Sequence, residues 1–99
     1  MGLFDTITKE KNIKKNAEWK QGLIHTVVEF HDDHMKLVTS AVTDTIFYQD
    51  IMNVEVVVNV VNIKTNVKTF SLISKSIRGG SDKANQLYEE ILRKMSENK

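Results

Sequence analysis

The clearest pattern along the chain is an alternation of apolar and polar residues that begins near residue 23. Within residues 24–30, one face of the alternation consists of Ile24, Thr26, Val28 and Phe30. A period of two with many β-branched and aromatic residues is typical of a half-buried strand. The sequence therefore predicts a strand here, a polar turn at residues 31–34 and a second strand at residues 35–39.

The middle of the chain predicts further strands. After a connection at residues 40–44, residues 45–48 indicate a short strand. Residues 51–61 are rich in Val on both faces, so we expect a central strand there rather than an edge strand. Turn-forming residues at 62–66 then lead to a returning strand at residues 67–73.

The end of the chain changes to the three-four spacing of an amphipathic helix. Its apolar stripe consists of Ala84, Leu87, Tyr88, Ile91, Leu92 and Met95. Ser81 is a favoured N-cap, and Asp82 complements the helix dipole in the first turn. Five or six strands followed by one helix, without β-α alternation, predict a mainly β, α+β fold. We expect a partly open antiparallel β-barrel or sandwich capped by the C-terminal helix.

The first twenty residues differ from the rest of the chain. They are polar and Lys-rich, with weak helical spacing at Leu3 and Ile7 and again at Ile13 and Ala17. We interpret residues 1–20 as an arm or loose helix and residues 21–99 as the folded domain. The first six residues also fit an N-myristoylation pattern, an alternative to a simple docking arm.

Composition narrows the class of protein. A chain of 99 residues fits one domain, and the absence of Cys removes disulfides, thiolate nucleophiles and Cys-based metal sites. Neither a long apolar run nor the pattern of a secretory signal is present, so we expect a cytoplasmic protein.

A block at residues 44–56, with the sequence DTIFYQDIMNVEV, resembles the bacterial pleckstrin-homology-like (PH-like) domains. The strand at residues 67–73 and the helix from Ser81 extend the resemblance to residues 23–97. It implies a sharply bent sheet of about seven strands with the helix over one opening. On that interpretation Asp50 accepts backbone hydrogen bonds at a turn, and Tyr48 is a half-buried packing residue with its hydroxyl at the rim.

Candidate chemistry is sparse. His31 and His34 are suitable ligands for a divalent metal, but no second ligand cluster accompanies them, so we expect hydrated turn residues. Gly79-Gly80, with Arg78, Lys75 and the helix start at Ser81, offers an anion cradle, with a flexible loop as the favoured alternative. No nucleophile elbow, cofactor motif or catalytic carboxylate pair is recognisable, so we expect no enzyme, cofactor or metal.

Charge is unevenly distributed and suggests two classes of partner. Residues 21–63 are mainly acidic. In residues 64–80 every charged residue is a cation, namely Lys64, Lys68, Lys75 and Arg78. The leading hypothesis is a non-enzymatic interaction module that binds a protein or copies of itself, by a sheet edge or an apolar patch near Trp19. The alternative is binding through those cations to an anionic membrane at the inner face, and no nucleic acid is expected.

Overall fold

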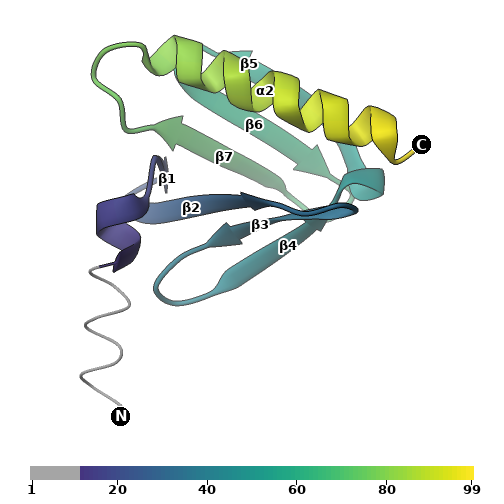
Figure 1. Ribbon diagram of the computed structural model, residues 1–99, viewed down its shortest axis with the longest axis horizontal. Helices are drawn as coiled ribbons and strands as arrows, with labels where there is room; N and C mark the ends of the chain where they lie inside the picture. The colour runs from purple at the N-terminus through teal and green to yellow at the C-terminus, as the bar shows by residue number, and fades with distance from the viewer. Residues whose placement is uncertain (1–11) are drawn as a thin grey trace.

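The structure, a computed structural model, describes residues 12–99 and consists of one curled sheet and a long C-terminal helix (Figure 1). Residues 12–16 are helical and lead into the sheet. The remaining elements are β1 (Trp19–Gln21), β2 (Ile24–Phe30), β3 (His34–Val38), β4 (Thr43–Phe47), the 3-10 turn η1 (Tyr48–Asp50), β5 (Ile51–Val57), β6 (Val60–Thr65), β7 (Thr69–Ser74) and α2 (Gly80–Glu97). The myristoylation pattern, Leu3 and Ile7 lie outside the described residues.

All seven strands pair antiparallel, in the order β4-β3-β2-β1-β7-β6-β5. The three-residue strand β1 joins the two halves of the sheet, because it pairs with β2 on one side and with β7 on the other. Trp19 lies opposite Ser74 and Lys20 opposite Ile73 at this junction. The result is a half-barrel packed against an 18-residue helix, which confirms the predicted fold class.

The prediction of one central strand over residues 51–61 is wrong. The structure divides this stretch into β5 and β6, and β5 is an edge of the sheet. Val57 pairs with Val60 across a two-residue turn, in which Val58 has a φ of 55°. A β-branched residue rarely adopts this left-handed region, so the sequence carries no turn signal at this point.

The N-cap of the helix α2 lies two residues earlier than expected. It is Gly79, with a φ of 72° and no side-chain capping bond, in place of Ser81. The helix then lies across β5, β6 and β7 (Figure 1). None of the helices in residues 12–99 is long and apolar enough to cross a membrane.

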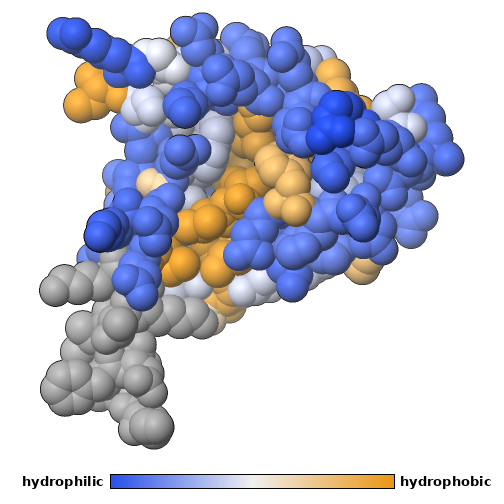
Figure 2. Space-filling view, viewed as in Figure 1, coloured by the Kyte–Doolittle hydropathy of each residue, from blue (hydrophilic) through white to orange (hydrophobic). Residues whose placement is uncertain are grey.

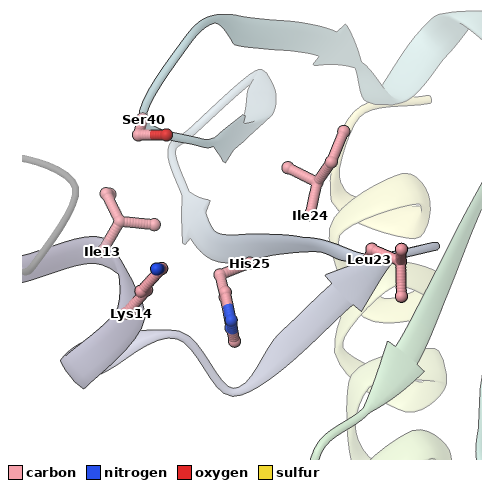
Figure 3. Close-up of a pocket in the computed structure, with 6 residues that line it drawn as sticks. All are labelled: Ile13, Lys14, Leu23, Ile24, His25 and Ser40. Atoms are coloured by element: carbon pink, nitrogen blue, oxygen red, sulfur yellow. The ribbon is translucent and has the colours of Figure 1, made fainter.

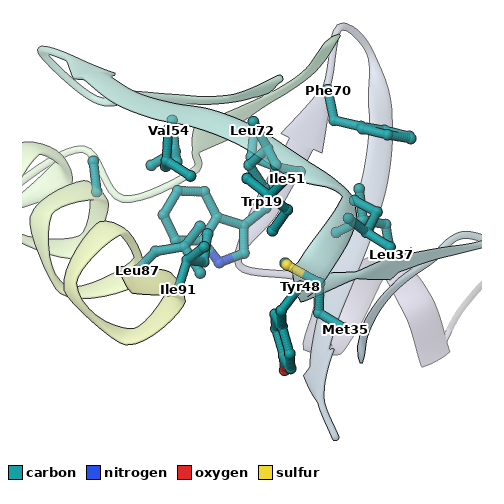
Figure 4. Packing of buried hydrophobic residues seen from close by; sticks show 14 residues of the cluster. Trp19, Met35, Leu37, Tyr48, Ile51, Val54, Phe70, Leu72, Leu87 and Ile91 are labelled. Carbon is teal, nitrogen blue, oxygen red and sulfur yellow. The ribbon is translucent and has the colours of Figure 1, made fainter. Parts of the chain in front are cut away.

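The hydrophobic core fills the space between α2 and the concave face of the sheet. Figure 4 shows Leu87 and Ile91 pointing from α2 towards the indole of Trp19. The fully buried members with large side chains include Met35, Leu37, Tyr48, Ile63, Leu72 and Ile91. Because Trp19 comes from β1, residues on both halves of the sheet share one core.

Candidate functional site

An apolar furrow lies between α2 and β2. It encloses about 210 Å³, and its apolar walls come from Trp19, Val28, Phe30 and Leu87. Figure 2 shows apolar surface gathered in the middle of this face, between α2 and the strands below it. We expected a partner to bind at an apolar patch near Trp19. In the structure Trp19 forms the floor of this furrow, because the residue is only 5% exposed. Val28 and Phe30 are half-buried and offer the accessible apolar surface.

The rim of the furrow carries charges of both signs. Its polar members are Glu18, Lys83, Gln86 and Glu90. Arg93 Nε donates a hydrogen bond to Glu90 Oε2 at 3.2 Å, and this bonding holds the pKa of Glu90 below its ordinary value. Glu90 is therefore ionised and held in place, while Lys83 lies two turns away on the same helix. A rim of mixed sign suits a protein surface better than a polyanion.

A second hollow lies at the tip of the β1–β2 hairpin. It encloses about 350 Å³ between residues 13–14, the hairpin tip and Ser40 of the β3–β4 loop (Figure 3). The tip presents Leu23 and Ile24 to solvent, and these residues are 90% and 55% exposed. Two adjacent apolar side chains at such exposure form a candidate contact with an apolar phase or partner.

The electrostatics of this second hollow are cationic. His25 lines it, and its Nδ1 is buried without a hydrogen-bond partner within residues 12–99. Desolvation lowers the pKa of His25, and the positive charges of Lys75, Lys20 and Lys14 lower it further. His25 is therefore neutral near physiological pH. The three lysines close enough to act on His25 form a local positive field around the hollow.

The structure does not bring the four predicted cations together. Lys64 and Lys68 lie where β6 turns into β7, and Lys68 Nζ lies 4.6 Å from the centre of the Phe70 ring. Lys75 and Arg78 follow the other end of β7, about 20 Å away at the usual rise of a strand. The four residues therefore make two separate pairs, and of the four only Lys75 lowers the pKa of His25 in the hollow.

The His31 and His34 rings stack at the β2–β3 turn. Their centroids are 4.7 Å apart with an interplanar angle of 12°. His31 Nε2 lies 3.3 Å from Glu29, whereas His34 Nδ1 lies 2.6 Å from Asp33. Each ring is thus engaged by its own carboxylate. No group of three potential metal ligands is found in the part of the chain that the structure describes.

The start of α2 is packed rather than open to an anion. A Cβ on Gly80 would lie 3.3 Å from the Cβ of Asn59 and 3.8 Å from Ser74 Oγ. The β5–β6 turn therefore lies directly against the first helical residue. Arg78 is exposed in the preceding loop, and no hydrogen bond in residues 12–99 orients its guanidinium towards the helix start.

The turn η1 differs from the expectation for both of its polar residues. Tyr48 is 1% exposed, so its ring is fully buried, and its hydroxyl donates a 2.8 Å hydrogen bond to the His31 carbonyl. Burial raises the pKa of Tyr48. The Asp50 carboxylate is exposed and makes no hydrogen bond within residues 12–99. Tyr48, not Asp50, therefore fixes this turn to the β2–β3 turn.

The free edge of β5 is the third candidate surface. Among residues 12–99 the strand pairs with β6 on one side only, and its exposed residues are Met52, Asn53, Glu55 and Val57. An edge strand offers unpaired backbone groups to another strand. The alternation correctly predicted that Val54 and Val56 lie on the same face of β5, but it did not predict that this strand lies at the edge of the sheet.

Sequence reasoning pointed to the Trp19 region but not to the furrow residues. Val28 and Phe30 were assigned to one face of a strand, which is correct, but the pattern does not show that α2 leaves this part of the face uncovered. The cationic hollow was missed because Lys75 is far from Lys14 and Lys20 in the sequence. No protein-family model, curated protein or solved structure matches the chain.

Proposed function

We propose that this domain is a non-enzymatic interaction module of the PH-like type that binds a protein partner in the furrow above Trp19. The observation that carries this proposal is the accessible apolar surface of Val28 and Phe30 beside a rigid, buried indole. Binding energy at protein interfaces concentrates in a few apolar anchors seated in such hollows. A volume of about 210 Å³ is suited to one or two inserted side chains.

The test uses one charge placed inside the furrow and the same charge placed outside it. Val28→Glu places a carboxylate among the apolar walls of the furrow. The control, Val42→Glu, places the same charge at a loop position that is 57% exposed. Gln86→Arg, on the exposed rim, blocks the furrow without touching the core. We expect a partner captured from lysate to be retained by the wild type and by Val42→Glu, and lost from the two furrow variants.

The only Trp in the chain gives a direct readout of the same event. Titration of the captured partner should change the intensity of the Trp19 emission, because the partner's side chains are seated directly above the indole. Equal retention by all four proteins would contradict the proposal. Circular dichroism of each variant verifies that it is folded.

A second candidate function, binding to an anionic membrane surface, is favoured by the cationic hollow. Lys14, Lys20 and Lys75 lie around a hairpin tip that exposes Leu23 and Ile24. Apolar residues that enter the interface, next to cations that attract acidic headgroups, are the two contributions to surface binding.

The membrane hypothesis is tested with vesicles that contain an acidic phospholipid. Lys20→Ala with Lys75→Ala should weaken binding by about 2 kcal/mol, or roughly thirty-fold, since each surface Lys contributes about 1 kcal/mol. Lys64→Ala with Lys68→Ala removes the same charge at the other end of β7 and should have a smaller effect. Equal loss in the two double variants would indicate a general charge effect instead of a site, and absence of binding by the wild type would reject the hypothesis.

A further inference from the structure

The backbone of β5 has a defined set of groups available for pairing. Val57 and Val60 flank the two-residue turn. The two residues at these places in a turn are hydrogen-bonded to each other. In an antiparallel ladder the bonded direction alternates from residue to residue. The backbone groups of Val54 and Val56 therefore point away from β6, towards the free side of the sheet.

We propose that a second copy of this chain pairs with that edge, β5 against β5, about a twofold axis at Val54. Val54 is the central residue of the seven in β5, so this register allows the two strands to overlap along their whole length. The outward groups of each Val54 then face each other as a hydrogen-bonded pair. This surface lies apart from the furrow, and the inference does not depend on the proposed partner there.

Charge selects this register over its neighbour. With the axis at Val54, Asn53 lies opposite Glu55 of the second copy, on the outer face of the sheet. Lys64 lies beside Asn53 in the ladder, so a cation and an amide face the incoming carboxylate. A shift that pairs Val54 with Val56 of the second copy would place the two Glu55 carboxylates directly opposite, which is repulsive.

The polar row would be continuous across both molecules. Glu55 already accepts a hydrogen bond from Asn62 Nδ2 at 3.5 Å, and Ser71 Oγ donates to Asn62 Oδ1 at 2.6 Å. The register shift between Ile51 and Asn53 leaves Met52 unpaired, a bulge that limits pairing at this end, so the central pairs carry the contact.

The flank of α2 next to β5 adds apolar surface to the same interface. The opposite flank, with Lys83 and Gln86, lines the furrow on the β2 side. At 100° per residue, Tyr88 and Leu92 therefore project towards the β5 side. Leu92 is 38% exposed, and Tyr88 is partly buried. The twofold axis brings these flanks of the two helices to the same face of the joined sheet, where they cover each other.

The absence of Cys from the chain permits a direct test of the register. Asn53→Cys and Glu55→Cys are made as separate single variants of the full chain, each at an exposed position. In the proposed register these two residues form a non-hydrogen-bonded pair with Cα atoms about 4.5 Å apart, close enough for a disulfide. When both copies are the same variant, the two cysteines are offset by two residues along the strands. Their Cα atoms are then more than about 7 Å apart, which is too far for a disulfide. We expect a disulfide dimer when the two variants are mixed and oxidised, and none from either variant alone.

Light scattering of the wild type and of Val54→Pro gives a second measurement, with circular dichroism to verify that the variant is folded. Proline removes the outward N–H of Val54, which bonds to the second copy's Val54 at the axis, and leaves the ladder with β6 intact, so the wild type should be dimeric and the folded variant monomeric. A disulfide dimer from Glu55→Cys alone would overturn the register, and a monomeric wild type with no cross-link in the mixture would overturn the self-pairing. Neither result bears on the furrow proposal, which the Val28→Glu and Gln86→Arg variants test separately.

Discussion

Val58 is the residue whose backbone departs furthest from the preference of its side chain. It has a φ of 55°, while its side chain is 74% exposed and contributes little burial. A left-handed conformation costs a residue with a Cβ about 1–2 kcal/mol. Only the first of the two turn residues has a positive φ, the position at which hairpin turns of this kind favour glycine.

Val58→Gly should therefore raise the free energy of unfolding by about 0.5–1 kcal/mol, after the entropic cost of glycine in the unfolded chain is subtracted. Urea denaturation at one fixed protein concentration measures it. Val57→Gly is the matched control, because Val57 is also exposed but lies within the strand, and this change should lower stability. A Val58→Gly protein less stable than the wild type would show that the turn carries no strain.

At the scale of elements, the sequence predicted the segments with the longest and clearest period. The alternation at residues 24–30 and the apolar stripe from Ala84 to Met95 correspond to β2 and α2. The prediction of a turn at residues 62–66 is wrong, because residues 62–65 belong to β6. Two other elements that the sequence missed lack a local signal. β1 has only three residues and is held by its neighbours, and the turn that separates β5 from β6 contains valine in place of a turn former.

The start of α2 illustrates how a backbone conformation can replace a side-chain cap. The Gly79 carbonyl accepts a 3.0 Å hydrogen bond from the Lys83 N–H, and the φ of 72° at Gly79 turns the chain from the loop into the helix. Gly79→Ala should lower the free energy of unfolding by about 1 kcal/mol, because alanine resists the left-handed region. Gly79→Asn should cost less, since asparagine tolerates it. Equal stability of the alanine variant and the wild type in thermal unfolding would argue against this role.

At the scale of the whole molecule, the candidate sites depend on contacts that no local pattern contains. The furrow requires β1, β2 and α2 to meet, and the cationic hollow requires residues 14, 20 and 75 to converge on His25. Sequence reasoning selected cations that are neighbours in the chain, but a strand of six residues separates them into two pairs. The fold class could be predicted because it follows from the order of elements, whereas the sites follow from how the two halves of the sheet and α2 pack together.

That packing rests on Trp19, which joins the two halves of the sheet through β1 and lies in the core beneath α2. Because both halves share this side chain, we expect one cooperative unfolding transition, with Trp19 fluorescence and far-ultraviolet circular dichroism giving superimposable curves. Trp19→Ala should lower the free energy of unfolding by about 3–5 kcal/mol, a large part of the 5–15 kcal/mol typical of a domain. Trp19→Phe keeps an aromatic ring in the junction and should cost less. If the two wild-type curves separate, or if the alanine variant loses less than about 1 kcal/mol, then the two halves of the sheet unfold independently and β1 does not couple them.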